Sequence, residues 1–384
     1  MEHLINNQVK NIQISGIRQF FNMVAKVPDA IQLTIGQPDF PTPDHIKEAG
    51  KKAIDENRTG YTKNRGLDEL CLAATEFQKS KYGLSYDPKT EVITTVGASQ
   101  AIDISLRTIL EKGVEVILPG PVYPAYEPII KMCGAIPVYI DTRETNFKLT
   151  AAQIEGAITD KTRCVILPYP ANPTGCILTE VELAAIADVL KDKDIFIVSD
   201  EIYSELVYGQ SHRSIASFPE MKAKTLIING LSKSHAMTGW RIGFVFAPEN
   251  ISKHILKVHQ YNVSCASSIS QYAASIALTA GVNDADTMRI EYQRRRDYVY
   301  DRLVSMGIDV VKPEGAFYLF PSIEKFGMSA DEFATRLLQE GKVACVPGTA
   351  FSSYGEGYLR ISYAYSMEIL EEGCNRIEKF ILTM

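Results

Sequence analysis

The stretch Asn229-Gly-Leu-Ser-Lys-Ser-His-Ala-Met-Thr-Gly-Trp-Arg-Ile-Gly243 decides how the rest of the chain is interpreted. It starts at the end of the apolar run Thr225–Asn229, and it contains Lys233, followed eight residues later by Arg241. A lysine in a turn is normally a solvated surface residue. Here the lysine lies between Ser232 and Ser234, and apart from Arg241 the segment has no other Lys, Arg, Asp or Glu, which indicates a functional amine.

Two further segments carry complementary groups. Asn172-Pro-Thr-Gly175 and Asp200-Glu-Ile-Tyr203 each come shortly after an apolar run, as Lys233 does. Together the three segments supply an amine, a guanidinium, an amide, a carboxylate and a phenol. This set matches the needs of pyridoxal phosphate (PLP), which has an aldehyde to be held as a Schiff base, a phosphate, a phenolic O3′ and a ring nitrogen to be kept protonated.

The apolar runs predict a parallel sheet. They are short, uniformly apolar and without alternation, as expected for strands buried on both faces. These runs are Glu115–Leu118, Arg163–Leu167, Asp194–Ser199 and Thr225–Asn229. Stretches with helical spacing separate them, for example Thr179–Leu190, where Thr179 and Glu182 can form a capping box. The pattern predicts an open α/β fold.

The candidate residues share one position in this pattern. Tyr123, Asn172, Asp200 and Lys233 each follow the carboxyl end of a different predicted strand. Ligands of open α/β sheets bind outside these ends, so we expect the four side chains to converge on one crevice.

Simpler interpretations remain open for each residue by itself. Asp200 could only cap a helix beginning at Glu201. The segment 172–175 could be only a turn, because its residue types favour turns. Tyr123 could be an ordinary core residue.

An anion site is also predicted. Thr94–Ile102 runs from a strand-like segment through Gly97 into a helix, and free N–H groups at a helix start favour an anion. Ser99 adds a hydroxyl donor, and Arg241 adds a forked pair of donors. The same segment could be a plain helix start.

The last third of the chain predicts a smaller α+β domain. A long helix is expected over 284–306, with strands over 308–311, 315–320, 343–346 and 358–362. We expect a large domain over 41–280 and a small domain formed by 1–40 and 281–384, with the first residues as an N-terminal arm.

Composition excludes other classes. The net charge of −6 gives no footprint for nucleic acid, and no run of about 18 apolar residues predicts a membrane span. The N-terminus lacks a basic segment followed by an apolar one, so no signal peptide is expected. The 7 cysteines form no C-x-x-C pair, which favours reduced thiols in the cytoplasm. No metal-binding motif is present, so no metal is expected.

These motifs, in this order and spacing, resemble the class I/II aminotransferases, which are PLP-dependent enzymes of fold type I. The similarity extends from Gly36-Gln-Pro-Asp-Phe40 to Tyr358-Leu-Arg-Ile-Ser362. Within the family the chain is similar to the bacterial aminotransferase A group, assigned as N-acetyl-L,L-diaminopimelate aminotransferases of lysine biosynthesis. Gly230–His235 and His259–Ser268 carry that narrower likeness, as does the segment 15–18.

The resemblance implies a role for each residue around the cofactor. Lys233 would bind the PLP aldehyde and move the substrate's proton, and Asp200 would pair with the ring nitrogen. Tyr203 and Asn172 would contact O3′, and Tyr123 would stack on the ring. Four groups would hold the phosphate: the amides of Ala98 and Ser99, the Ser99 hydroxyl and Arg241.

It also implies how substrate and subunits meet. Arg360, aided by the Gly36 backbone, would bind the α-carboxylate of an amino acid or 2-oxo acid. Tyr61 would reach the phosphate in the other subunit of a homodimer with shared active sites. One departure is Gly230, where some branches have a phosphate-binding Ser or Thr, and Ser232 is a weak replacement.

The amino donor stays open at this stage. A distal carboxylate needs a cation, and Arg18, Lys63 and Arg65 are the candidates. An aromatic amino acid aminotransferase is the main alternative. A PLP-dependent C–S β-lyase would use the same lysine, aspartate and tyrosine. A non-enzymatic aminotransferase-like regulator would need a DNA-binding segment, and no basic helix-turn-helix region precedes residue 30.

Overall fold

The computed structural model describes residues 1–13 and 16–384, except for the side chains of residues 18 and 19. Besides short 3₁₀ turns, its helices are α1 (Asn7–Lys10), α2 (Gly16–Val24), α3 (Asp44–Asp55), α4 (Asp68–Tyr82), α5 (Gly97–Ile109), α6 (Tyr126–Met132), α7 (Ala151–Ala157), α8 (Glu180–Leu190), α9 (Leu231–Ser234), α10 (Glu249–Val263), α11 (Ser268–Ala277), α12 (Ala285–Ser305), α13 (Ala330–Gln339) and α14 (Met367–Ile381).

A seven-stranded sheet forms the centre of the molecule, with strand order β2-β8-β7-β6-β5-β3-β4. Its strands are β2 (Val92–Thr95), β3 (Glu115–Gly120), β4 (Ile136–Asp141), β5 (Thr162–Leu167), β6 (Phe196–Asp200), β7 (Thr225–Gly230) and β8 (Gly243–Phe246). The pairs from β7 to β4 are parallel, and β8 runs antiparallel to both its neighbours. The four apolar runs predicted as strands are β3, β5, β6 and β7, which confirms the predicted mostly parallel sheet.

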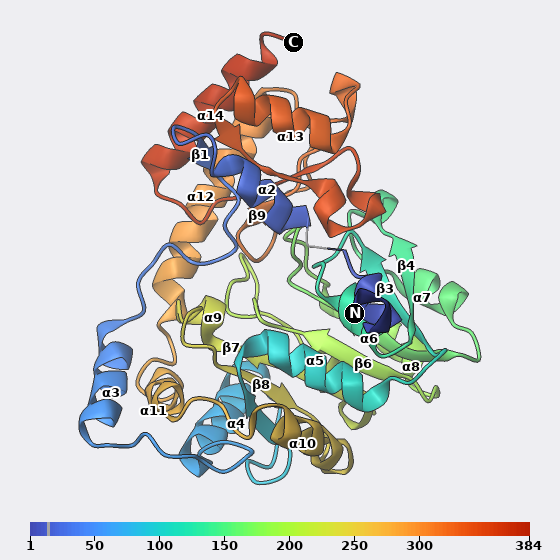
Figure 1. The fold of residues 1–384 in the computed structure, drawn as a ribbon, viewed down its shortest axis with the longest axis vertical. Helices are drawn as coiled ribbons and strands as arrows, with labels where there is room; N and C mark the ends of the chain where they lie inside the picture. The colour runs from blue at the N-terminus through green and yellow to red at the C-terminus, as the bar shows by residue number, and fades with distance from the viewer. Residues whose placement is uncertain (14–15) are drawn as a thin grey trace.

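Helices cover both faces of this sheet, which explains why its strands are uniformly apolar. Along β3, Val116 and Leu118 pack in one cluster with residues of α5, α6 and α10, whereas Ile117 packs in another with residues of α7 and α8. Figure 1 shows α5 crossing one face of the strands. The predicted helix at Thr179 is α8, and its capping box with Glu182 is present.

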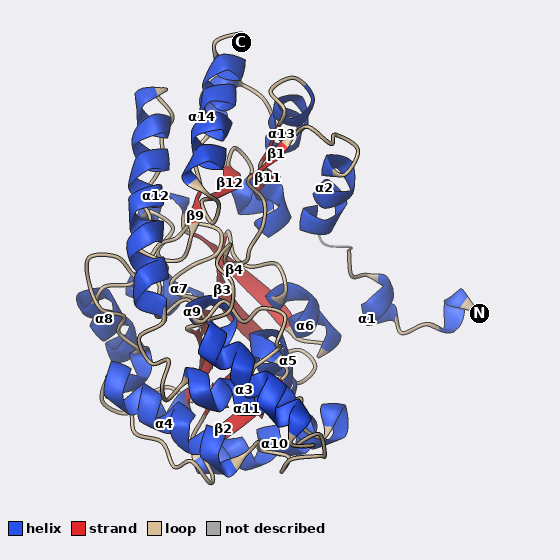
Figure 2. Cartoon of the chain, turned by 90° about the vertical axis from the view of Figure 1, so that its left-hand side faces the viewer, coloured by secondary structure: helices blue, strands red, loops and turns tan. Residues whose placement is uncertain are grey.

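Two small sheets lie apart from the central one. The strands β11 (Val346–Pro347), β12 (Leu359–Ser362) and β9 (Tyr318–Leu319) form an antiparallel sheet, and β1 (Ile31–Gln32) pairs in parallel with β10 (Val343–Ala344). Figures 1 and 2 show them among α2, α12, α13 and α14. Of the first forty residues, α2 and β1 therefore lie against the last third of the chain, whereas α1 lies near α6. The domain limits at 40/41 and 280/281 remain our proposal.

The predicted strands of the last third are partly wrong. The long helix is confirmed as α12, and the segment predicted at 358–362 is β12. The segment 308–311 is not a strand, because Asp309 O accepts only the single bond from Ser322 N (2.8 Å) rather than a ladder. The predicted strand at 315–320 shortens to β9, and 343–346 divides into β10 and the start of β11.

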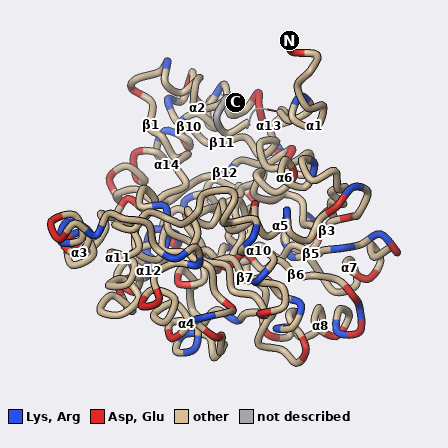
Figure 3. The backbone as a smooth tube through the Cα atoms, turned by 60° about the horizontal axis from the view of Figure 1, so that its bottom comes forward, with Lys and Arg blue, Asp and Glu red and all other residues tan. Residues whose placement is uncertain are grey.

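The surface carries charges of both signs. Figure 3 shows Lys and Arg interspersed with Asp and Glu along the tube rather than gathered by sign. Within the described residues, no helix is both long and apolar enough to cross a membrane. The first residues, including α1, extend to one side of the body in Figure 2.

Candidate active site

A cavity of about 490 Å³ opens at the carboxyl ends of the parallel strands. Tyr123 follows β3, Asn172 follows β5, Asp200 ends β6 and Lys233 follows β7, and all four line the cavity. The expected convergence of these side chains is confirmed. It arises because parallel strands place their carboxyl ends along one edge of the sheet.

Lys233 lies in the single turn of α9, directly after β7. Its Nζ donates a hydrogen bond to the carbonyl of Gly36 and lies 5.6 Å from the ring centre of Tyr203. The pKa of the amine is lowered to about 8, mainly by burial and in part by the nearby guanidiniums of Arg360 and Arg241, while Asp200 opposes the change. A lysine in such surroundings is partly neutral near pH 8 and can act as a nucleophile or a base.

Asp200 is a buried carboxylate at the end of β6. Its Oδ2 accepts a hydrogen bond from the hydroxyl of Tyr126 at 2.6 Å, and its Oδ1 accepts one from the N–H of Ile202 at 3.2 Å. Burial raises the pKa of this carboxyl to about 6, although the two hydrogen bonds oppose the rise. The group is therefore an acceptor that gains from an incoming cation. The backbone bond resembles a cap, but no helix begins at residue 201.

Two phenols shape the walls of the cavity. The hydroxyl of Tyr203 lies 2.8 Å from that of Tyr318, and burial raises the pKa of Tyr203 well above 10. Tyr123 packs edge-on against Tyr126 with ring centres 5.7 Å apart. Burial also raises the pKa of Tyr123, so both wall tyrosines stay neutral at physiological pH.

An anion cradle lies beside these groups, at the start of α5. Ala98 and Ser99 line the cavity there, together with Arg241. Gly97 has a φ of +76°, and a Cβ on it would meet Nη2 of Arg241 at 2.6 Å, so only glycine lets the guanidinium lie this close to the helix start. A Cβ on Gly243 of β8 would likewise meet the N atom of Ala98 at 2.5 Å.

The departure at Gly230 has a steric reason. A Cβ there would lie 2.9 Å from the carbonyl oxygen of Ile242 and 3.0 Å from Cα of Gly243. A side chain therefore cannot be added at position 230 without moving backbone. Ser232 lines the cavity from the following turn.

Arg360 brings a buried guanidinium from β12 of the small sheet to the same cavity. Nη1 donates to Oδ1 of Asn172 at 3.0 Å, and Nη2 donates to the carbonyl of Thr34 at 2.5 Å. Its guanidinium lies 4.5 Å from the ring centre of Tyr318. Nε is buried and has no partner among the described atoms.

Several expected residues lie elsewhere. Tyr61 is 93% exposed and does not line the cavity of its own chain. Lys63 is exposed and pairs with Asp68 at 2.5 Å, while Arg65 donates to the carbonyl of Val92 at 2.8 Å. Neither cation reaches the cavity within this chain. The side chain of Arg18 lies outside the described residues.

Other lining residues were missed from the sequence. Tyr126 holds Asp200, and Tyr318 joins Tyr203 to Arg360. Ile17 and Phe21 of α2 add an apolar wall. A tyrosine within the apolar run 315–320 was the one available signal for Tyr318, because apolar strands rarely need a hydroxyl.

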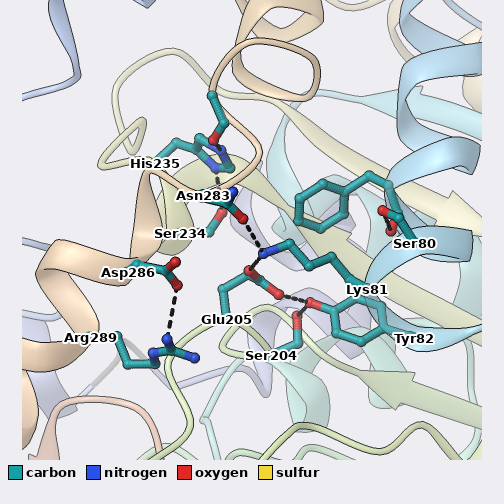
Figure 4. Close-up of polar contacts among 12 residues, drawn as sticks. Ser80, Lys81, Tyr82, Ser204, Glu205, Ser234, His235, Asn283, Asp286 and Arg289 are labelled. Carbon is teal, nitrogen blue, oxygen red and sulfur yellow. Dashed lines mark hydrogen bonds and ion pairs between the residues drawn. The ribbon is translucent and has the colours of Figure 1, made fainter.

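A second set of polar contacts holds the lysine turn from residues outside the cavity lining. His235 is fully buried, and burial lowers its pKa, so it stays neutral. Its Nε2 lies 3.0 Å from the carbonyl of Gly281, and its Nδ1 lies 2.7 Å from Oγ of Ser234. Figure 4 shows the pair near the contacts that join Lys81, Tyr82, Ser204, Glu205 and Asn283.

Known proteins were compared with the chain as a whole. The family described as aminotransferase class I and II matches residues 28–377. The chain is 60% identical over 382 residues to the probable N-acetyl-LL-diaminopimelate aminotransferase of Bacillus subtilis, covering 100% of this chain and 97% of the relative.

More distant relatives carry other names. The chain is 42% identical to the aromatic-amino-acid aminotransferase 2 of Thermococcus litoralis, with 98% of each chain covered. The solved structure of Thermus thermophilus aspartate aminotransferase with maleate superposes with a TM-score of 0.92 at 34% identity, covering 98% of this chain and 99% of that one.

The depressed pKa of Lys233 predicts a stability cost in the cofactor-free protein. The pKa of the amine is 10.5 ordinarily and about 8 in the folded chain. Folding therefore opposes protonation, and the cost is complete below pH 8 and disappears as the pH rises toward 10.5. It amounts to at most ~3 kcal/mol. Lys233→Met should thus raise the free energy of unfolding at pH 7, and it should raise it much less at pH 10.

Urea unfolding of the apoprotein at both pH values measures this difference. Lys253→Met serves as the control, since Lys253 is an exposed lysine on α10. Its effect should be small and the same at both pH values. A Lys233→Met protein that is less stable than the wild type at pH 7 would contradict the prediction.

Proposed function

The chain belongs to the class I and II aminotransferases, and from this premise we propose that it moves an amino group between N-acetyl-L,L-2,6-diaminopimelate and the 2-oxoglutarate/glutamate couple in lysine biosynthesis. The expected family, fold type and PLP dependence are confirmed. The relative at 60% identity supports this donor. The aromatic alternative is supported by the 42% relative and by the apolar wall of Ile17 and Phe21.

The residues around the cavity fit PLP. The anion cradle of Ala98, Ser99 and Arg241 suits the phosphate, because free helix N–H groups and a guanidinium converge there. Asp200 is the buried acceptor that a protonated ring nitrogen needs. We assign contacts with O3′ to Tyr203 and Asn172, and ring stacking to Tyr123.

The single observation that carries the proposal is the arrangement of Lys233, Asp200 and Arg360 around one cavity. When bound, PLP supplies an electron-withdrawing ring that stabilises the negative charge left at the substrate's Cα. Asp200 holds the proton on the ring nitrogen and so maintains that withdrawal. The Lys233 amine, with a pKa lowered to about 8, can take the proton from Cα and return it elsewhere.

Arg360 orients the substrate in this scheme. Its guanidinium is already fixed by Asn172 and Thr34, and Arg360 lines the cavity in which a carboxylate would contact it. Burial strengthens such a charge pair, because the surroundings have a lower dielectric constant than water. The Gly36 loop closes the same side, since its carbonyl contacts Lys233.

We further propose that the enzyme works as a cytoplasmic homodimer. Tyr61 is almost fully exposed in the single chain, although the family resemblance places a tyrosine there at a cofactor phosphate. Tyr61 can be exposed in the single chain and still contact a cofactor phosphate if it enters the site of a second copy. An exposed phenol of this kind gains burial on association.

The donor assignment predicts the outcome of a substrate panel. With 2-oxoglutarate as acceptor, kcat/KM for glutamate formation should be higher with N-acetyl-L,L-diaminopimelate than with aspartate, phenylalanine or tyrosine. Lys233→Ala should lose transfer from every donor, by more than the ~10²–10⁴-fold that loss of a general base costs. A higher kcat/KM for phenylalanine or tyrosine would favour the aromatic alternative, whereas pyruvate release from cystathionine without transfer would indicate a lyase.

The assignment of Arg360 predicts a loss shared by all donors. Arg360→Ala should lower kcat/KM for each amino donor by a similar factor, equivalent to about 2–5 kcal/mol, because every donor has an α-carboxylate. Arg360→Lys should recover only part, since lysine lacks the planar fork. Arg336→Ala, which removes a half-buried arginine of α13 that does not line the cavity, should leave kcat/KM unchanged for every donor. An effect limited to one donor would instead indicate that Arg360 contacts the side chain of that donor rather than the α-carboxylate.

The shared site predicts complementation between two inactive variants. Tyr61→Asp and Lys233→Ala proteins, mixed and allowed to exchange subunits, should form hybrids with one doubly altered and one intact site. Random exchange makes about half the dimers hybrid, so activity should return to roughly a quarter of wild type. If Tyr61 acts within its own chain, every site keeps one lesion and mixing restores nothing.

A further inference from the structure

Glu201 is a buried carboxylate that the proposed reaction does not use. It directly follows Asp200 at the end of β6, and 0% of its surface is exposed. Its N–H donates to the carbonyl of Ile228 in the neighbouring β7 at 2.8 Å, so its backbone is fixed. A carboxylate removed from water in this way is costly unless a positive charge or several donors compensate it.

Three side chains contact this carboxylate. Oγ of Ser199 and Oγ of Ser214 donate to Oε1 at 2.8 and 2.5 Å. Nε2 of His212 lies 3.0 Å from Oε2, and the His212 side chain is only 8% exposed. Among the side chains that the structure describes, His212 is the only basic group in contact with Glu201.

The other ionisable groups nearby do not offset the charge. The phenols of Tyr82 and Tyr86 stay neutral, because burial raises the pKa of both. The ring of Tyr82 packs edge-on against that of His212, with ring centres 5.3 Å apart, and its hydroxyl donates a hydrogen bond to Glu205. Arg213, next to His212, forms an ion pair with Glu180 at 3.5 Å, and Glu205 forms one with Lys81 at 3.1 Å.

The negative charge of Glu201 affects the proton affinity of Asp200. Burial is the main reason that the pKa of Asp200 is raised, and the negative charge of Glu201 raises it further, while Lys233 lowers it. Asp200 has to stay ionised to hold a protonated ring nitrogen. His212, 3.0 Å from Oε2 of Glu201, is the basic group placed to offset the charge that opposes this.

We propose that His212 is a positioning residue: it forms an ion pair with Glu201, and this pair offsets the charge beside Asp200 and keeps the Asp200 carboxylate ionised when the cofactor is bound. His212 does not line the cavity and acts only through Glu201 and Asp200. The inference rests on the proposed pairing of Asp200 with the ring nitrogen.

Ring-¹⁵N-labelled PLP in the holoenzyme tests the proposal, because the nitrogen chemical shift reports whether the ring is protonated. In His212→Gln the uncompensated Glu201 should draw the proton to Asp200. The ¹⁵N shift should move toward that of neutral pyridine, and kcat should fall by the same factor as the fraction of protonated ring that this shift reports. The KM of the donor should stay the same.

Matched variants separate charge from packing. The double variant Glu201→Gln/His212→Gln should regain the wild-type ¹⁵N shift and most of kcat, because both charges are gone. His212→Lys, which keeps a positive charge, should retain more kcat than His212→Gln. A purely structural role predicts the opposite, with the double variant at least as impaired as the single one.

Three outcomes would overturn the inference: a wild-type ¹⁵N shift in His212→Gln, an unrescued double variant, or a double variant that does not fold. If only His212→Gln fails to fold, a folded double variant with a protonated ring supports the inference, because an unpaired buried charge explains the failure. A neutral ring nitrogen in the wild-type enzyme would instead refute the pairing with Asp200, and so the proposed function itself.

Discussion

The burial of unlike charges at one edge of the sheet is the constraint on which the rest of the structure depends. Lys233 loses proton affinity because it is buried beside two guanidiniums, and Asp200 gains proton affinity because it is buried. The charged form of each group is thus less favourable than in water, and each shift costs folding free energy. The large apolar core around the sheet offsets that cost, and a bound cofactor that pairs with both groups relieves it.

Two parts of the chain have to meet for the site to exist. The central sheet supplies the amine, the carboxylate and the anion cradle, whereas Arg360 comes from β12 of the small sheet and Gly36 from the segment after β1. Contacts across this junction run through the reacting region itself, from Arg360 to Asn172 and from Lys233 to Gly36. A relative movement of the two sheets would therefore change substrate binding and the position of the amine together.

The sequence predicted the residues that follow strands better than the partners that hold them. Lys233 and Asp200 were identifiable because short apolar runs and turn residues are local signals. Tyr126 and Tyr318 were not, because a phenol on a helix or strand gains its role only from a tertiary contact. The segment 308–311 failed for a related reason, since apolar character indicates burial but does not supply a neighbouring strand.

The pairing of β1 with β10 also sets an order for biosynthesis. The Gly36 loop is fixed by partners near the end of the chain, as in the bond from Ile35 N to the Tyr365 hydroxyl, 330 positions apart. A ribosome releases the central sheet long before those partners emerge. The nascent chain can fold its anion cradle early, but the segment around β1 has to wait, unpaired, until residues 343–365 have been made. Assembly of the reacting region is thereby among the last events in making the enzyme.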